Sequence, residues 1–266
     1  MNHSSTVASV QKHLNESRIL LSQGVTQPYI LGETNSLYNE GAPGLSNSFG
    51  AALWGLDFNL HCAANNIRRV HMHQGTNYRY ASWQPIQTVN ETLGTKAPYY
   101  ANIAVARFLG NSVGGGGGGA EKAENVTVAE VDLAAAAASA SASIYHSAYA
   151  AYLDGRLARL AVIQMRAYNY STAGPGQRPV ETFEFQLDGE LAATVKEVVA
   201  ERLIANGSDA ITGVTFGGYS FNHELEEGRP VLLKNVSASE PVQVQQGRGF
   251  AVNVPWSSAV VLNFAY

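Results

Sequence analysis

Residues 28–86 read PYILGETNSLYNEGAPGLSNSFGAALWGLDFNLHCAANNIRRVHMHQGTNYRYASWQPI, and the periodicity of this stretch changes twice. The apolar run at 28–32 ends in glycine, as a short buried strand does. Residues 48–65 carry apolar side chains at helical spacing, and residues 67–73 again have the pattern of a short strand. A strand, a polar loop, a helix and a strand form a βαβ unit, whose usual setting is a parallel sheet or an eight-stranded barrel.

The flanking residues predict two further helices. Residues 1–24 are typical of an amphipathic helix, and residues 74–98 are expected to form a loop. Pro98 suits the first turn of a helix that Gly110 ends. The apolar face of the first helix is expected to include Val7, Val10, Leu14, Ile19 and Leu21.

The pattern becomes β-rich after Gly110. Six glycines at 114–119 are typical of a spacer, and 134–143 is an Ala/Ser stretch. Dipeptides such as Asp154-Gly155 and Gly217-Gly218 are typical of hairpin turns. Strands without intervening helices predict an antiparallel sandwich. The predicted strands cover 125–132, 144–153, 157–170, 180–187, 195–205, 230–236, 240–245, 249–254 and 258–264.

We therefore expect two parts. Residues 1–112 would form an α/β part of a (β/α)8 barrel, and residues 113–266 an all-β sandwich that begins with a Gly-rich linker at 113–124. A complete barrel needs ~200 residues or more. The chain is therefore expected to be truncated.

Composition limits the partners. The formal net charge is −4, and the 17 Lys and Arg do not cluster beside aromatic residues, so we expect no nucleic-acid partner. No apolar run is long enough to span a membrane.

Export is inferred from glycosylation motifs. Residues 1–24 do not have the pattern of a signal peptide, and the single cysteine, Cys62, excludes an intramolecular disulfide. Seven Asn-x-Ser/Thr motifs nevertheless suit a secreted glycoprotein, although Asn- and Ser-rich loops would also produce them. They begin at Asn2, Asn15, Asn90, Asn125, Asn169, Asn206 and Asn235.

Glu33 follows the first predicted strand directly, at the rim where barrel active sites are built. A solvated loop glutamate is the alternative reading of that position. His71 and His73 lie two residues apart on the second strand and so share a face. No third residue follows at metal-ligand spacing, so hydrogen bonding to a sugar or to Glu33 is expected instead of metal binding.

Residues 28–86 closely resemble the region around strands seven and eight of the barrel in glycoside hydrolase family 79, the group of β-glucuronidases and heparanase-like enzymes. PYYANIAVARFLG at 98–110 is similar to the last barrel helix, and YLDGRLARLAVI at 152–163 is similar to the C-terminal β-domain. The resemblance implies a retaining hydrolase of terminal β-glucuronosides, with 4-O-methylated ones among the candidates. It implies a carbohydrate partner and no cofactor.

The resemblance also implies roles for single residues. Glu33 would be the nucleophile, and Tyr38 would lie around the sugar carboxylate. Tyr78 or Tyr80 would supply a second such tyrosine, with loop packing as the alternative for both.

A retaining mechanism needs a second carboxylate. In this family the acid/base precedes the nucleophile, in an Asn-Glu pair at a strand end. Asn15-Glu16 is predicted to be helical, and Asn39-Glu40 and Asn90-Glu91 lie downstream in loops. We therefore expect the acid/base to lie outside the chain and the chain alone to be inactive. A non-catalytic carbohydrate-associated β-sandwich and a sugar-binding module are the alternatives.

Overall fold

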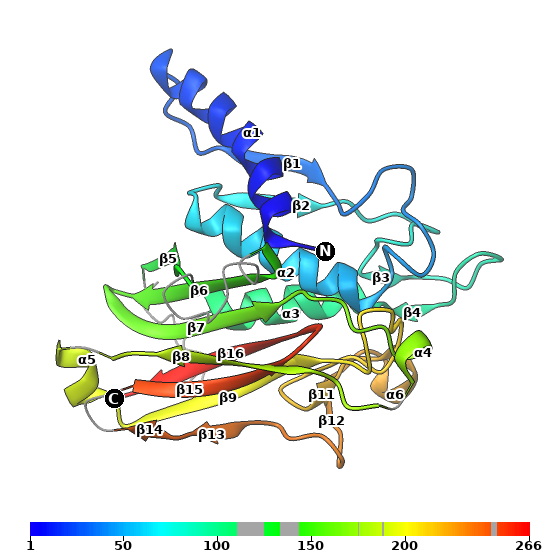
Figure 1. Ribbon diagram of the computed structural model, residues 1–266. Coiled ribbons are helices and arrows are strands. Elements are labelled where there is room, and N and C mark those ends of the chain that lie inside the picture. The colour runs from blue at the N-terminus through cyan, green and yellow to red at the C-terminus, as the bar shows by residue number, and fades with distance from the viewer. Residues whose placement is uncertain (111–124, 134–143, 175, 188, 246–248) are drawn as a thin grey trace.

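The computed structural model describes residues 1–110, 125–133, 144–174, 176–187, 189–245 and 249–266. These residues stack in layers, which Figure 1 shows from top to bottom. A pair of short strands with a long helix lies above two further helices, which cover a large antiparallel sheet. A smaller antiparallel sheet packs on the opposite face of the large one.

The βαβ unit is present as predicted. Strand β1 (Ile30–Thr34) pairs in parallel with β2 (Arg69–Met72), and helix α2 (Phe49–Ala64) connects them. A small core of Val10, Leu31, Phe58, Cys62 and Ile67 lies between this pair and the helices. The parallel pairing is confirmed, whereas its assignment to strands seven and eight of a barrel stays a prediction.

Helix α2 begins against the β-rich part of the chain. Ser48 precedes it in an extended conformation, but its side chain accepts no hydrogen bond from the amides of the first turn. The amides of Phe49 and Gly50 instead donate to the carbonyl oxygens of Ala210 and Ser208, both at 2.7 Å. Amides in the first turn of a helix have no partner within that helix, so these bonds join its start to a distant loop.

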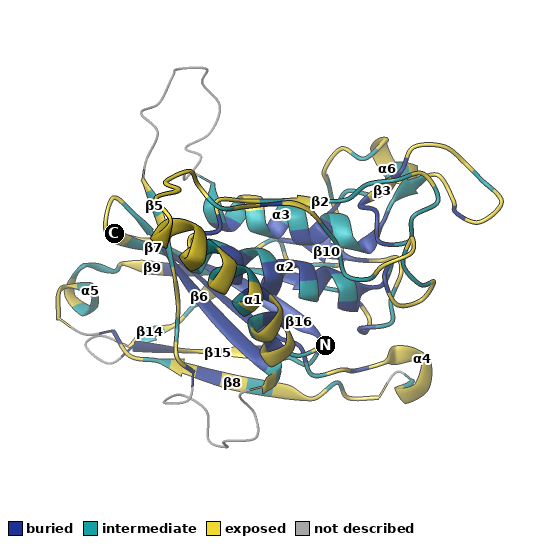
Figure 2. Ribbon diagram, turned by 90° about the horizontal axis from the view of Figure 1, so that it is seen from above, coloured by how far each residue is buried: buried dark blue, intermediate teal, exposed yellow. Residues whose placement is uncertain are grey.

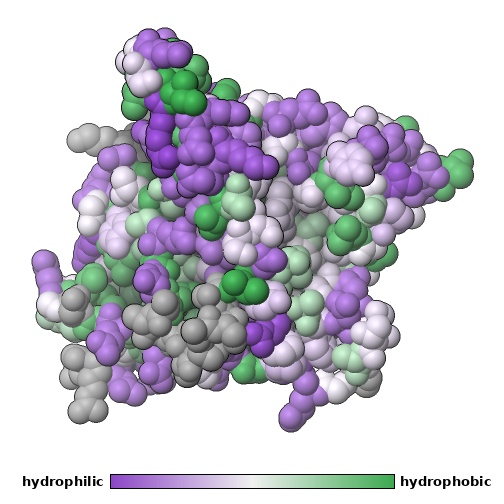
Figure 3. All heavy atoms as spheres, turned by 45° about the horizontal axis from the view of Figure 1, so that its top comes forward, coloured by the Kyte–Doolittle hydropathy of each residue, from purple (hydrophilic) through white to green (hydrophobic). Residues whose placement is uncertain are grey.

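Helix α1 (His3–Ser22) is capped by Asn2, whose side chain accepts the amide of Ser5. Its buried residues are confined to its first half. The predicted apolar face is wrong at its far end, because Ile19 and Leu21 are 57% and 65% exposed. The helix extends beyond the underlying strands, and Figure 3 shows hydrophobic side chains at its protruding tip.

Helix α3 (Ala97–Leu109) begins with proline in its first turn and ends at Gly110, as predicted. The segment before it is not all loop. Strands β3 (Trp83–Gln84) and β4 (Gly94–Thr95) pair within it as an antiparallel hairpin. A strand of two residues is too short for an alternation of apolar and polar side chains to be recognised in the sequence.

The described residues after 124 form two antiparallel sheets. The larger sheet has nine strands, in the order β12-β11-β10-β9-β16-β7-β6-β5 with β13 also beside β9, and the smaller has the order β14-β15-β8. The predicted sandwich is thereby confirmed in outline. The strands are β5 (Val126–Glu130), β6 (His146–Leu153), β7 (Arg156–Gln164), β8 (Val180–Phe185), β9 (Glu197–Ile204), β10 (Thr215–Phe216), β11 (Tyr219–Ser220), β12 (Val231–Leu232), β13 (Glu240–Val242), β14 (Val244–Gln245), β15 (Gly249–Pro255) and β16 (Ser258–Ala265).

Two turn predictions are confirmed. Asp154 and Gly155 have φ of 48° and 84° and join β6 to β7, and Gly217 and Gly218 have φ of 53° and 74° and join β10 to β11. Positive φ at both central residues matches the right-handed twist of the flanking strands.

Other details of the strand prediction are wrong. Strands are not free of intervening helices, because α4 (Tyr170–Ala173), α5 (Gly189–Thr194) and α6 (His223–Glu226) lie between them. The strand predicted at 157–170 stops at Gln164, and 240–245 divides into two strands of different sheets. Single turns of helix are too short for a periodic signal.

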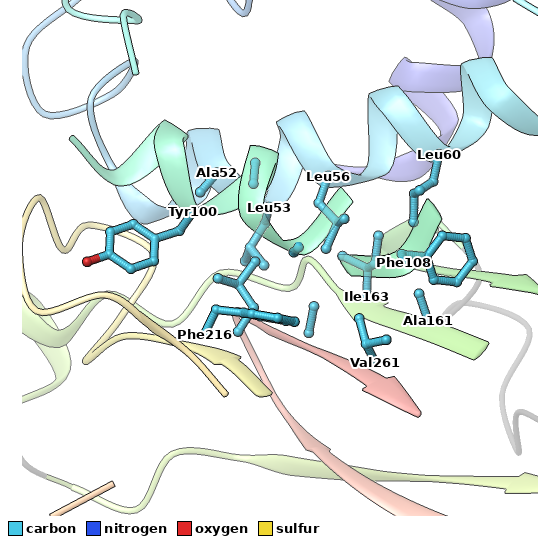
Figure 4. Packing of buried hydrophobic residues seen from close by; sticks show 14 of the residues in the cluster. Ala52, Leu53, Leu56, Leu60, Tyr100, Phe108, Ala161, Ile163, Phe216 and Val261 are labelled. Atoms are coloured by element: carbon cyan, nitrogen blue, oxygen red, sulfur yellow. The ribbon is translucent and has the colours of Figure 1, made fainter. Parts of the chain in front are cut away.

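Two apolar cores flank the large sheet. One lies between this sheet and helices α2 and α3, and includes Leu56, Phe108 and Ile163 (Figure 4). The other fills the space between the two sheets, around Phe183 and Val260. Figure 2 shows the buried residues running along the facing sides of these elements, while α1 is largely exposed.

The predicted division at residue 113 stays a prediction. The first core contains residues from both sides of it, so the helical layer and the sheet pack as one body. The predicted linker at 113–124 and the Ala/Ser stretch lie outside the described residues. Within the described part, no helix is both long and apolar enough to cross a membrane.

Candidate active site

Glu33 is the fourth residue of β1, and its side chain is exposed near the carboxyl end of that strand. Two hydrogen bonds outside the β1–β2 pairing also hold the ends of these strands together. The amide of His73 donates to the carbonyl oxygen of Thr34 at 2.9 Å, and the Asn35 side chain donates to the carbonyl oxygen of His73 at 2.9 Å. These bonds place the residues after β2 beside the end of β1.

His73 lies at the centre of an aromatic cluster with Tyr78 and Tyr80. The Tyr78 ring stacks on His73 with centroids 5.1 Å apart, and the Tyr80 ring meets it edge-on at 6.0 Å. The Tyr80 hydroxyl lies 3.2 Å from His73 Nδ1. Three of the five residues predicted to bind substrate are therefore brought together.

Glu33 acts electrostatically on this cluster. Tyr80 is only 7% exposed, and burial is the main reason why its pKa is raised. The charges of Tyr78, Glu33 and Glu40 raise it further. The Tyr80 hydroxyl therefore stays protonated, and it lies within hydrogen-bond distance of His73 Nδ1.

The other two predicted binding residues lie apart from the cluster. Tyr38 is 78% exposed in the loop after β1, and His71 is exposed on β2. Val70 and Met72 pack toward the small core under the strand pair. His71 and His73 are therefore on the opposite face, as their spacing predicts.

An ion network joins the loop after β1 to the loop after β2. Arg79 lies 3.3 Å from Glu40 and 3.3 Å from Glu91, and Glu91 lies 2.6 Å from Lys96. Glu91 and Lys96 are both buried. Both downstream glutamates are thus in ion pairs with cations.

A second polar network connects α1, α2 and β5. Among the described residues, His3, His61 and Glu130 form one group whose ligand atoms lie within 4.8 Å of one another. His3 Nε2 lies 2.8 Å from Glu130, His61 Nδ1 lies 2.9 Å from the same carboxylate, and His3 Nδ1 lies 3.1 Å from Asp57.

These distances are those of hydrogen bonds. Burial alone would lower the pKa of His3, but hydrogen bonds to Asp57 and Glu130 and the charges of both outweigh it and raise the pKa to about 9. Both ring nitrogens of His3 therefore carry protons near neutral pH. The ligand atoms of this group are already engaged in hydrogen bonds to one another. We interpret it as a structural ion network.

Sequence reasoning missed this network and the Arg79 network. One signal was available for the first. Asp57 lies next to Leu56 on a helix whose buried residues, apart from His61, are otherwise apolar, and a carboxylate there needs a buried partner. Its partners are His3 and Tyr149, and no local pattern relates those positions to residue 57.

The β-rich part is similar to a known class of glycosidase domain. Residues 148–261 match the C-terminal β-domain of glycosyl hydrolase family 79, and the predicted resemblance to that family is confirmed.

Similarity extends over nearly the whole chain. This chain is 48% identical to a β-glucuronidase of Aspergillus niger and 46% identical to one of Neurospora crassa, and each alignment covers 99% of this chain. These alignments cover 46% and 50% of the two relatives, so the chain spans about half their length.

A solved structure shares the fold. The 4-O-α-L-rhamnosyl-β-D-glucuronidase of Fusarium oxysporum, solved as a Rha-GlcA complex, superimposes with a TM-score of 0.73 at 23% identity. The match covers 98% of this chain and 48% of that enzyme.

Proposed function

We propose that this chain is the nucleophile-bearing part of a retaining glycoside hydrolase that acts on terminal β-glucuronosides, 4-O-methylated ones included. The observation that carries the proposal is Glu33, exposed near the carboxyl end of β1, where the amide of His73 is hydrogen-bonded to the carbonyl oxygen of Thr34. Such strand ends are where barrel enzymes place catalytic groups. The names of the similar proteins support the substrate class.

In the proposed reaction a Glu33 carboxylate oxygen attacks the anomeric carbon of the glucuronoside. The bond from that carbon to the aglycone oxygen breaks, and the acid/base delivers a proton to the departing oxygen. Water, deprotonated by the same acid/base, then cleaves the glycosyl ester and restores the Glu33 carboxylate. The configuration at the anomeric carbon is retained because it is inverted twice.

The cluster would hold the sugar. The Tyr78 and Tyr80 hydroxyls can donate to the glucuronate carboxylate, with Tyr38 added from the adjoining loop. His73 would orient Tyr80, and His71 would face the sugar from β2. Neutral donors suit this role because they bind a carboxylate without pairing permanently with Glu33.

The acid/base is not assigned to Glu40 or Glu91, because each is paired with Arg79. We propose that it lies outside these 266 residues, and that the chain alone is inactive. Loss of general acid catalysis typically costs ~10²–10⁴-fold in rate.

A covalent label tests the nucleophile. A 2-deoxy-2-fluoro-β-glucuronide with an activated aryl leaving group would be incubated with a form of the chain extended upstream to supply the acid/base, and the trapped glycosyl group would be mapped by mass spectrometry. We expect the adduct on Glu33, and no adduct in Glu33→Gln. Glu190→Gln, on α5, is the matched control and should label normally. An adduct on another carboxylate would exclude the assignment.

We also propose that the protein is exported and glycosylated. Asn90 and Asn125 are exposed and are the expected acceptor sites, whereas Asn2 is engaged as the cap of α1. Treatment of the protein from its native host with an endoglycosidase should increase its gel mobility. An unchanged mobility would contradict the proposal.

A further inference from the structure

Lys96 is a buried cation beside the aromatic cluster of His73, Tyr78 and Tyr80. Its side chain is 8% exposed, and its ammonium donates to the carbonyl oxygen of Tyr78 at 3.0 Å. The Glu91 carboxylate lies 2.6 Å from the same ammonium and is equally buried. A charge withdrawn from water is costly unless it is paired and hydrogen-bonded. Glu91 provides the pairing, and the Tyr78 carbonyl provides a further hydrogen bond from the backbone of the cluster.

Helix α3 gives Lys96 a fixed position. Lys96 directly precedes this helix, and its amide donates to the carbonyl oxygen of Ser82 at 2.9 Å. Tyr100 and Ala101, within the first turns of α3, are 1% and 2% exposed in the core that packs on the large sheet. Because such interiors are close-packed, the start of the helix cannot shift without disturbing them. The Lys96 ammonium therefore ties the cluster to a rigid element.

Tyr78 lies at the end of a tight turn. Its amide donates to the carbonyl oxygen of Gly75 at 3.1 Å, and a Cβ added to Gly75 would lie 2.5 Å from the Tyr78 ring. The ring therefore lies against the backbone of the turn. Asn77 has φ of +70°, a left-handed conformation that persists in a non-glycine residue only where its surroundings hold it. A contact that fixes this turn also fixes the direction of the ring that stacks on His73.

Through Glu91 the same ion network reaches the loop after β1. Arg79 lies 3.3 Å from Glu91 and 3.3 Å from Glu40, and its amide donates to the carbonyl oxygen of Glu40 at 2.7 Å. A Cβ added to Gly41 would lie 3.1 Å from the Tyr80 ring. The Tyr80 ring therefore packs against the turn that Arg79 holds, and the cluster is fastened from two sides.

We propose that Lys96 is a positioning residue of the proposed active site, whose contact with the Tyr78 backbone holds the Tyr78 and Tyr80 hydroxyls where they receive the glucuronate carboxylate. The proposal rests on the proposed function, in which these two hydroxyls donate to that carboxylate. Glu91 neutralises the ammonium, so Lys96 acts through the backbone and not as a charge on the sugar. The carboxylate is remote from the reacting bond, so weaker binding of it should appear mainly in KM.

The first measurement does not depend on hydrolysis. The chain, extended upstream to supply the acid/base, would be labelled with ¹³C in its histidine rings, and the His73 ring protons would be followed by NMR. A tyrosine stacked on an imidazole displaces those resonances upfield, and Tyr78→Leu identifies the displacement by abolishing it. We expect Lys96→Met to remove most of the displacement. Arg107→Met, the control, removes another cation of α3 from its ion pair with Glu201 at 2.7 Å and should leave the displacement unchanged.

A double variant separates positioning from misfolding. Lys96→Met leaves Glu91 without one of its cations, whereas Lys96→Met combined with Glu91→Gln leaves neither charge of this pair buried alone. Thermal unfolding shows that the double variant is folded. Its His73 displacement should be lost as in the single variant.

Kinetics of the extended chain provide the second measurement. For an aryl β-glucuronide we expect KM to rise roughly tenfold in Lys96→Met with a smaller change in kcat, and Arg107→Met to match the wild type. A His73 displacement that persists in both Lys96 variants would overturn the proposal. Its loss without a rise in KM would also overturn it, because Lys96 would then stabilise the loop without serving the substrate. The proposed function fails on different evidence, the absence of a Glu33 adduct in the wild type.

Discussion

His3 in helix α1 lies 2.8 Å from Glu130 in strand β5, so an ion pair joins the first helix to the large sheet across 127 residues of sequence. The other ring nitrogen of His3 faces Asp57 at 3.1 Å, and Tyr149 donates to the same Asp57 oxygen at 2.7 Å. Asp57 is fully buried, so His3 compensates a charge that water does not reach.

This ion pair predicts how stability depends on pH. The pKa of His3 is raised from 6.5 to about 9, so its contribution is complete below pH 6.5 and is lost as the pH rises to 9. Hydrogen bonds from His3 and His61 lower the pKa of Glu130 from 4.5 to about 2, so its contribution is complete above pH 4.5 and is lost as the pH falls to 2. From these groups we expect the highest melting temperature between pH 4.5 and 6.5.

His3→Gln tests the alkaline side. This variant keeps a polar side chain but has no charge to lose, so its melting temperature should decline less between pH 6.5 and 9 than that of the wild type. His13→Gln, on the same helix and partly exposed, is the control. Parallel declines in the wild type and His3→Gln would assign the alkaline loss to other groups.

The core between the helices and the large sheet should be sensitive to truncation. Leu56 is fully buried there, so Leu56→Ala is expected to lower the free energy of unfolding by about 2–5 kcal/mol. Leu21, which is 65% exposed at the tip of α1, is the matched control. Leu21→Ala should change the free energy of unfolding by less than about 0.5 kcal/mol. Denaturant unfolding measures both, and similar losses would contradict the packing described.

Gly249 is required by the backbone around it. Its φ is +119°, and an added Cβ would overlap the carbonyl oxygen of Phe185 on the adjacent strand β8. Gly249→Ala should therefore separate β15 from β8 and destabilise the small sheet. Gly155→Ala, with φ of +84° and open space around the new methyl group, incurs only the conformational strain of ~1–2 kcal/mol. If Gly249→Ala lowers the free energy of unfolding no more than Gly155→Ala does, the clash described here is contradicted.

Tyr80→Phe tests the aromatic cluster within the proposed enzyme. The variant keeps the ring but loses the hydroxyl beside His73, so we expect a fall in kcat/KM of roughly tenfold for an aryl β-glucuronide, from the loss of one hydrogen bond to the substrate. Tyr219→Phe, on a partly exposed tyrosine of β11, should be neutral. If Tyr80→Phe leaves kcat, KM and their pH dependence unchanged, Tyr80 contributes only packing.

Much of the local structure was predictable because its causes are local. The apolar spacing at 48–65 produced α2, Pro98 and Gly110 bounded α3, and Asp154-Gly155 and Gly217-Gly218 formed their hairpins. The place of Glu33 near a strand end also follows from the residues just before it. His71 and His73 share a face because side chains alternate along any strand.

Distant contacts were not predictable in this way. Nothing in the residues around Tyr78, Tyr80 and His73 shows that their rings meet, because that depends on how the loop after β2 folds back. The same holds for the amides of α2 that donate to the loop at 208–210, and for Gln84, whose unpaired amide is visible only once its surroundings are built.

By itself the sequence determined the helices, the longer strands, their main turns and the resemblance to family 79, because periodicity and turn chemistry act over a few residues. Only the tertiary structure decided which charges are paired and which side chains share a site. His3, Asp57 and Glu130 form one network although no pattern connects them, and burial makes that pairing necessary. An unpaired charge in the interior would cost more free energy than the surrounding contacts supply.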